Sequence, residues 1–147
     1  MDVTGVDDPR TNLVVRTAEQ TDRAEIRRLL RELHPDGAES LTLPAIRVDA
    51  QTFIARVGED AVGLAVVTFV DYGHEPYGML EELVVDSSRR GTGVGRALVE
   101  ECRAWLGRLG AEVVFVSAVD ERAAEFYLGT GFERCSGPWL FGAVRGG

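Results

Sequence analysis

The sequence contains no lysine, and its 16 basic residues are all arginine. A P-loop NTPase needs a Gly-Lys-Ser/Thr step at the start of a helix, so this absence argues strongly against that class of phosphate-binding protein. Only two cysteines occur, Cys102 and Cys135. They are too few and too isolated in the sequence to predict a disulfide framework or a zinc site.

Long apolar runs and a basic N-terminus are also missing. The longest apolar run, 61–70, is interrupted by Gly63 and Thr68, so we interpret it as a buried strand and not as a membrane span. The first residues carry acid where a secretory signal peptide needs base. The net charge of −8 at pH 7 disfavours a nucleic acid as partner, because nucleic-acid-binding proteins are typically basic. We therefore expect a cytoplasmic protein that binds neither membrane nor nucleic acid.

The chain has 147 residues, of which 45% are hydrophobic, which is enough for one domain with a sizeable core. We predict a flexible leader over 1–11 and a single domain over 12–147. Hydrophobic periodicity and turn residues predict an α/β fold with a central mixed, largely antiparallel sheet of six to seven strands and helices on both faces. The predicted strands cover 12–17, 52–57, 61–70, 78–85, 112–118, 132–135 and 139–144. The predicted helices cover 22–33 (with Asp22 and Glu25 as a capping box), part of 37–51, 94–109 and 121–129.

The most informative stretch is 84–98, where an apolar strand runs into a glycine-rich loop led by arginine and then into an amphipathic helix. Gly91, Gly93 and Gly95 remove the side chains that would keep the main chain away from a ligand. Unpaired N–H groups at the start of the helix carry partial positive charge. This arrangement predicts a site for a phosphate or a diphosphate.

Two further phosphate-binding patterns can be compared with this loop once the P-loop is set aside. The dinucleotide pattern G-x-G-x-x-G fails in both registers, because Arg96 and Leu98 occupy its last position. The other pattern, Arg-x-x-Gly-x-Gly at Arg90, Gly93 and Gly95, resembles the acyl-CoA diphosphate loop of the GNAT superfamily of N-acetyltransferases. The alternative is a glycine-rich turn without a ligand, which the flanking arginines disfavour.

A second motif supports the same resemblance. Residues 120–132 read Asp-x-x-Ala-x-x-Phe-Tyr-x-x-x-Gly-Phe. They are similar to the family's Asn-x-x-Ala-x-x-Phe-Tyr-x-x-x-Gly-Phe, with Asp120 in place of Asn. With the loop and the element order, the resemblance covers about 13–144. It implies a GNAT-like fold and acetyl transfer from acetyl-CoA to an amine.

The resemblance also implies which residues bind the cofactor. The main chain of the strand before the loop is expected to pair with the pantetheine arm and to supply an oxyanion donor. Asp120 departs from the family pattern, because an ionised carboxylate only accepts hydrogen bonds. Capping of the following helix is therefore the better interpretation of that side chain. The predicted cofactor-binding residues are Leu83, Val84, Val85, Arg90, Gly91, Thr92, Gly93, Val94, Gly95, Arg96 and Asp120.

Acetyl transfer to an amine needs a proton acceptor, because an alkylamine has a pKa of ~10.4 and is protonated at pH 7. Glu81, in the Leu-Glu-Glu-Leu sequence of 80–83, is our candidate. Some family members carry a catalytic or water-positioning Glu in a similar setting. Adjacent strand residues face opposite sides, so Glu81 and Glu82 cannot both face one cleft unless a bulge intervenes. The alternative is that both carboxylates are structural.

The resemblance places Tyr127 near the CoA sulfur, where its hydroxyl could protonate the leaving thiolate. Its alternative role is core packing. His34 and His74 are further candidate bases, and both lie in loops where a histidine is more often simply exposed. Asp71 and Glu75, with His74, could line an acceptor pocket.

Two functions from different classes follow. The first is an acetyl-CoA-dependent N-acetyltransferase whose acceptor is a small-molecule or peptide amine, with a small preference for cationic acceptors because the chain is acidic. The second is a non-catalytic acyl-CoA-binding sensor module. Use of longer acyl donors stays open. Apolar residues in the predicted C-terminal strands allow a homodimer.

Overall fold

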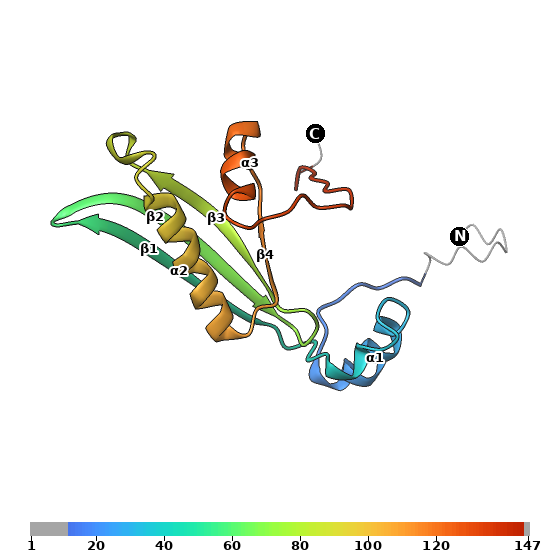
Figure 1. Cartoon of the computed structure of the whole chain (residues 1–147). Helices are drawn as coiled ribbons and strands as arrows, with labels where there is room; N and C mark the ends of the chain where they lie inside the picture. Colours follow the sequence, from blue (N-terminus) through green and yellow to red (C-terminus); the bar gives the residue numbers. More distant parts are fainter. Residues whose placement is uncertain (1–11, 146–147) are drawn as a thin grey trace. The chain divides into compact units, whose positions relative to one another are not determined.

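The computed structural model describes residues 12–145, and the predicted leader at 1–11 lies outside the described residues. The described residues form two compact units, one with 12–46 and Tyr72–His74 and one with Arg47–Asp71 and 75–145 (Figure 1). The prediction of a single domain stays a prediction. In chain order the elements are η1 (Gln20–Asp22), α1 (Arg23–Leu30), η2 (Ala38–Ser40), β1 (Arg47–Val57), β2 (Asp60–Asp71), β3 (Tyr77–Val85), η3 (Ser87–Arg89), α2 (Val94–Leu109), β4 (Val113–Val116) and α3 (Glu121–Leu128).

The second unit is built on one mixed sheet with the strand order β1-β2-β3-β4. β1 pairs with β2 and β2 with β3 in antiparallel fashion, whereas β3 and β4 are parallel. The parallel pairing covers only four positions, from Tyr77 opposite Val113 to Leu80 opposite Val116. The predicted mixed, largely antiparallel sheet is therefore confirmed. Its predicted size is wrong, because the described residues form four strands and not six to seven.

β3 contains one extra residue, Glu81. The register passes from Leu80 opposite Val67 to Glu82 opposite Val66, so Glu81 has no register partner on β2. Residues opposite one another share a face, and successive residues of β2 alternate between faces. Glu82 therefore lies on the face opposite to that of the buried Val67. A bulge of this kind shifts the alternation along β3 by one residue.

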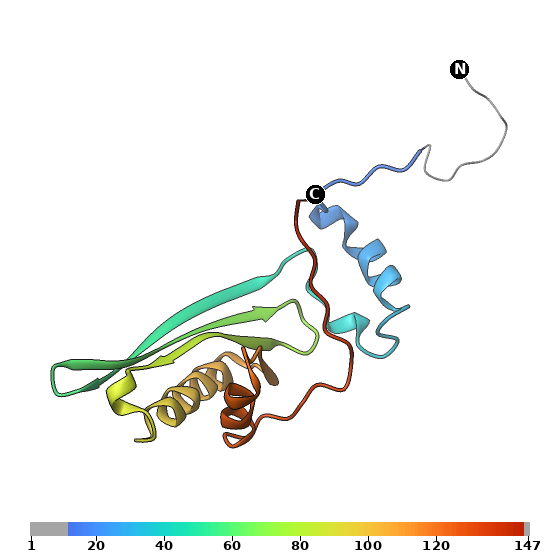
Figure 2. The same cartoon turned by 90° about the horizontal axis from the view of Figure 1, so that it is seen from above.

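Helix α2 covers one face of the sheet and contacts β1, β2 and β3 (Figures 1 and 2). Its apolar stripe follows the helical period, and the helix has the bounds predicted from the sequence. Burial of this stripe against the middle strands forms the core. The buried core cluster consists of Ala65, Val67, Phe69, Leu80, Leu98, Val99, Cys102 and Leu106.

Close packing of α2 on β3 depends on Gly78. A Cβ atom at Gly78 would lie 2.4 Å from Cδ2 of Leu106, which is 3% exposed. We expect Gly78→Ala to lower the free energy of unfolding by about 1–3 kcal/mol through overpacking. Gly107→Ala is the control, because a Cβ there meets nothing within 4 Å and should stabilise the helix by up to about 1 kcal/mol. Urea denaturation measures both, and an equally stable Gly78→Ala variant would contradict this packing.

Helix α3 lies on the same side of the sheet as α2 (Figure 2). Asp120 caps it, because its Oδ1 accepts a hydrogen bond of 2.8 Å from the Ala123 N–H. Arg96 on α2 donates to the Gly129 carbonyl at 2.9 Å, which ties the end of α3 to the start of α2. The prediction that helices cover both faces of the sheet stays a prediction.

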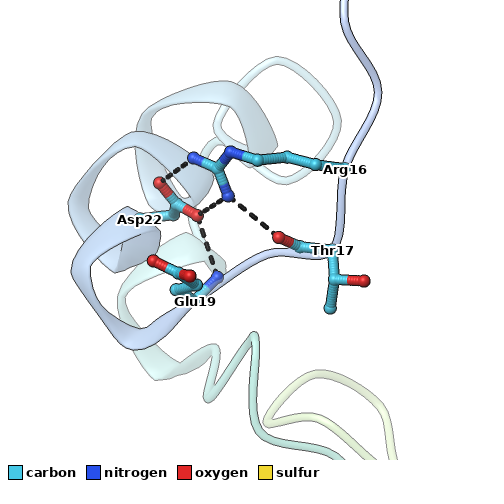
Figure 3. Close-up of polar contacts among 4 residues, drawn as sticks. All are labelled: Arg16, Thr17, Glu19 and Asp22. Atoms are coloured by element: carbon cyan, nitrogen blue, oxygen red, sulfur yellow. Dashed lines mark hydrogen bonds and ion pairs between the residues drawn. The ribbon is translucent and has the colours of Figure 1, made fainter.

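The first unit is organised at its N-terminal end by the Asp22 carboxylate (Figure 3). Arg16 donates to Oδ2 and Oδ1 of Asp22 at 2.8 and 2.9 Å, and it also donates to the Thr17 carbonyl. The Glu19 N–H donates to Oδ2 of the same carboxylate at 2.9 Å. The hydrogen bonds from Arg16 and then from Glu19 lower the pKa of Asp22 to about 2. This carboxylate is therefore ionised at neutral pH. It holds Arg16 and the Glu19 main chain in place just before η1.

The predicted helix at 22–33 exists, but it is shorter and its cap differs. The α-helix covers Arg23–Leu30. The predicted capping box of Asp22 with Glu25 is wrong, because the Asp22 side chain accepts from Arg16 and from the Glu19 N–H that precedes it. The predicted short second helix within 37–51 is the single turn η2.

Three predicted strands are absent from the described part of the chain. Residues 12–17, 132–135 and 139–144 have no ladder partner there, although their apolar character is typical of strands. Apart from Phe132, their large apolar side chains are strongly exposed, from 66% for Leu13 to 103% for Val144. Two aromatic rings of these segments have contacts. Trp139 stacks on Phe115 of β4 at a centroid distance of 6.1 Å, and Phe132 lies edge-to-face on Tyr127 at 5.5 Å and packs against the core cluster. A strand needs a hydrogen-bonded neighbour, which β-propensity alone does not supply.

No helix within residues 12–145 is long and apolar enough to cross a membrane.

Candidate active site

The glycine-rich loop lies beside a hollow of about 490 Å³ in the second unit. The end of β3, the loop and the start of α2 form most of its wall, and α3 contributes one aromatic ring. Three arginines line it, so the wall is basic although the chain is acidic overall. The lining residues are Leu83, Val85, Arg89, Arg90, Gly91, Gly93, Val94, Gly95, Arg96 and Phe126.

Two of the loop glycines have a main-chain conformation that other residues rarely adopt. Gly91 and Gly93 have φ of 78° and 92°, in the left-handed region that glycine adopts most readily. A Cβ at either position would meet nothing within 4 Å, so main-chain conformation and not crowding selects glycine here. Gly95 differs, because a Cβ there would lie 3.0 Å from Cζ of Phe126. Its glycine lets α3 pack closely against the first turn of α2.

These residues fit the diphosphate of an acyl-CoA. Gly93 is the N-cap of α2 and offers no side-chain cap, and the first turn contains no acidic residue. The N–H groups of that turn therefore keep their partial positive charge for an anion. Arg89 and Arg90 add formal charge on the same wall. An uncapped helix start with basic neighbours is the chemistry that binds phosphate groups.

The strands next to the hollow leave room for an extended arm. β3 and β4 are paired only as far as Leu80 and Val116, and β3 continues to Val85 without a partner on that side among residues 12–145. The main chain of 81–85 therefore presents an unpaired edge beyond the bulge. The predicted pairing of Leu83, Val84 and Val85 with the pantetheine arm is compatible with this edge.

The two candidate carboxylates of β3 share one face. Glu82 lies opposite Val66, on the face away from α2. The Oε2 atom of Glu81 accepts a hydrogen bond of 3.0 Å from Oγ1 of Thr68. Thr68 is two residues from Val66 and therefore on the same face. A bulge is the one arrangement that lets Glu81 and Glu82 face the same side, and it is present here. Both exposed carboxylates therefore lie together on this face.

Tyr127 on α3 is held by edge-to-face contacts with two neighbouring rings. The ring centroids are 5.2 Å from Phe126 and 5.5 Å from Phe132. Burial raises the pKa of the Tyr127 hydroxyl, and the negative charge of Glu82 raises it further. The phenol is therefore protonated at neutral pH and is electrostatically linked to a carboxylate of the bulged strand.

Other predicted site residues have partners within the fold. The Thr92 hydroxyl donates to the Arg89 carbonyl and closes the loop turn. Arg96 lines the hollow but its guanidinium also binds Gly129. Asp120 caps α3 and lines a second hollow of about 610 Å³ beside β4, not the one at the loop. A cofactor contact by Asp120 stays a prediction.

The two histidines lie together in the first unit. The rings of His34 and His74 are 3.9 Å apart at their centroids and tilted by 37°. His74 belongs to the loop between β2 and β3, and Asp71 and Glu75, which precede and follow Tyr72–His74 in the sequence, belong to the second unit. Roles for these four residues as bases or acceptor ligands stay predictions.

Three residues of the site were not selected from the sequence. Arg89 and Phe126 line the hollow, although neither was predicted as a cofactor-binding residue. Thr68 donates a hydrogen bond to Glu81. The only feature of the sequence that could have pointed to Thr68 is a hydroxyl inside an otherwise apolar strand.

The chain matches a known protein family. Residues 18–132 match the model of the acetyltransferase (GNAT) family, so the chain belongs to this family. Among curated proteins, none matches the sequence. The predicted class, an acetyl-CoA-dependent N-acetyltransferase, and the predicted cofactor are confirmed at the level of the family.

Solved structures support the same fold. The aminoglycoside N-acetyltransferase AAC(6')-Iy in complex with CoA is 27% identical, with a TM-score of 0.58 and coverage of 88% of this chain and 98% of that one. AAC(6')-IG from Acinetobacter haemolyticus is 17% identical, with a TM-score of 0.57 and coverage of 91% and 100%. An aminoglycoside acetyltransferase from an uncultured soil metagenomic sample, determined with sisomicin, is 19% identical, with a TM-score of 0.55 and coverage of 87% and 93%.

The left-handed conformation of the loop gives a direct prediction. Gly93→Ala places a Cβ on a residue with φ of 92°, which costs about 1–2 kcal/mol for a non-glycine residue. We expect a tilted first turn of α2 and about tenfold weaker CoA binding, equivalent to about 1.4 kcal/mol. Gly58→Ala, with φ of 61° and equally open surroundings, is the matched control in the β1–β2 turn. Equal CoA affinity of the two variants by calorimetry would argue against a role for the loop.

Proposed function

We propose that the protein transfers an acetyl group from acetyl-CoA to a primary amine of a small cationic molecule, by direct attack while both substrates are bound. The observation that carries this proposal is the bulge in β3, which sets Glu81 and Glu82 on one face next to the unpaired edge of the strand. Two adjacent carboxylates attract an ammonium group and can accept its proton.

The residues that would hold the cofactor are those of the basic hollow. The N–H groups at the start of α2, with Arg89 and Arg90, would bind the diphosphate, and the edge of 81–85 would pair with the pantetheine arm. When bound, acetyl-CoA supplies an acyl group on a thioester. Main-chain N–H groups of that edge would polarise the acyl oxygen.

Two side chains would move protons. Glu81 accepts the proton of the acceptor ammonium, so that the nitrogen lone pair can form the new N–C bond. Tyr127 would donate its proton to the sulfur as the C–S bond breaks. The raised pKa of Tyr127 keeps this proton in place at neutral pH. The acylated nitrogen would then lose its second proton, which restores the Tyr127 hydroxyl, and Glu81 would release its proton to solvent. The products are the acetylated amine and free CoA.

The preference for a cationic acceptor also has support from the comparisons. The neighbour at 27% identity is an aminoglycoside N-acetyltransferase, and aminoglycosides are polycationic amines. The net charge of −8 acts in the same direction by attracting cations to the surface. We therefore place aminoglycosides and polyamines ahead of neutral peptides as acceptors.

A panel of acceptors tests the proposal. Purified protein is incubated with acetyl-CoA and with aminoglycosides, polyamines, amino acids or N-terminal peptides, and the release of free CoA thiol is measured. We expect turnover with at least one polycationic amine. Thermal stabilisation by CoA without thiol release across the panel would instead favour the sensor function. The predicted homodimer, the compartment and the acyl-chain length of the donor stay predictions.

A further inference from the structure

Glu81 lies outside the regular pairing of β2 and β3, so the orientation of its carboxylate has to be set by a neighbouring side chain. As the extra residue of the bulge, it lacks a residue directly opposite on β2. Its carboxylate is exposed, and an exposed glutamate without a fixed partner samples several rotamers. A proton acceptor must instead be held near one geometry relative to the amine. Something next to the bulge has to supply that constraint.

Thr68 of β2 is placed to supply it. Its Oγ1 donates to Oε2 of Glu81 at 3.0 Å. The residues directly opposite Thr68 are Ala50 on β1 and Met79 on β3, and neither side chain offers a strong hydrogen-bond acceptor. The hydroxyl therefore reaches diagonally to Glu81, two residues beyond Met79, as cross-strand diagonal pairs can.

The position of Thr68 is itself well fixed. Its chain neighbours Val67 and Phe69 are fully buried beneath α2. A threonine side chain is branched at Cβ and has few χ1 rotamers in a strand. The donor thus comes from a rigid part of the sheet, whereas the acceptor sits on the irregular part.

We propose that Thr68 is a positioning residue for the acetyl transfer, which orients the Glu81 carboxylate toward the acceptor amine. The hydroxyl occupies Oε2 and leaves Oε1 for the ammonium proton. Thr68 itself forms and breaks no covalent bond and transfers no proton. This inference rests on the proposed function, since it assigns Glu81 the role of proton acceptor.

The test is a double-mutant cycle in steady-state kinetics. Thr68→Val removes the hydroxyl at nearly constant shape, Thr68→Ser keeps it, and each is made alone and together with Glu81→Gln. Thr52→Val is the matched control, because Thr52 lies on β1 opposite Val66 on the same face and its hydroxyl is not bound to Glu81. Calorimetry of CoA binding and thermal melting are measured for every variant.

We expect Thr68→Val to lower kcat about tenfold, as loss of a hydrogen bond to a charged group does, with unchanged affinity for CoA. Thr68→Ser should stay within about threefold of wild type, and Thr52→Val within about twofold, because surface changes without a partner have small effects. In the Glu81→Gln background, Thr68→Val should add less than about twofold, because the two residues act as one unit.

The outcomes separate the two proposals. If the wild-type protein turns over and Thr68→Val has the same kcat, the inference is overturned and the proposed function stays intact. A loss that is equally large in the Glu81→Gln background, or that Thr68→Ser fails to rescue, shows a structural role and also overturns it. No turnover by wild-type protein with any amine overturns both proposals.

Discussion

Glu81→Gln is expected to lower kcat by about 10²–10⁴-fold, the range that general base catalysis supplies. The amide keeps the size of the side chain and can still accept from Thr68, but it cannot take up a proton near neutral pH. The protonated acceptor amine then has no base in place. Steady-state kinetics with a polycationic acceptor measures the effect, and the loss should shrink at high pH, where more of the amine is already neutral.

A matched control separates base catalysis from a change in total charge. Glu59→Gln makes the same substitution in the turn between β1 and β2, where the side chain is exposed. We expect its kcat to stay within about twofold of wild type. A Glu81→Gln variant that turns over at the wild-type rate would remove Glu81 from the reaction, and a matching loss in Glu59→Gln would point to charge alone.

Tyr127→Phe is expected to lower kcat by about 10²-fold, because the thiolate loses its general acid. The ring keeps its edge-to-face contacts with Phe126 and Phe132, so stability should change little. Kinetics at neutral pH measures the loss, and Tyr77→Phe on β3 is the control for removal of a phenol hydroxyl. Near-normal turnover of Tyr127→Phe would contradict the acid role.

Protonation of the leaving thiolate by Tyr127 should make kcat fall at alkaline pH. Tyr127 acts as an acid only while it is protonated, and burial and the charge of Glu82 both raise its pKa. Wild-type kcat should therefore persist to higher pH than an ordinary tyrosine would allow. Glu82→Gln removes the negative charge, lowers the pKa of Tyr127 and should move the alkaline limb of the kcat profile to lower pH. A limb that stays in place would show that Tyr127 does not control it.

The parts of the fold that follow from local sequence signals were predictable. The bounds of α2 are those predicted, because its apolar stripe, the glycine before it and Gly110 after it act within a few residues of each helix end. The same is true of Asp120 as the cap of α3. These features need no information about distant residues.

The features that depend on a second strand were not predictable. The bulge at Glu81 is a property of the register between β2 and β3, and a single strand sequence does not contain it. The bond from Thr68 follows from that register, so it was missed for the same reason. The strands predicted at 12–17, 132–135 and 139–144 show the converse error, because apolar residues are present there and a hydrogen-bonded neighbour among the described residues is not.

Calorimetric titration of CoA into the purified full-length chain tests most directly whether the loop between β3 and α2 is a diphosphate site. We predict saturable binding of one CoA per chain, which weakens at high salt because arginines line the wall. Absence of binding at millimolar CoA would contradict the account, since every proposed role of Glu81, Tyr127 and Thr68 requires the cofactor beside them.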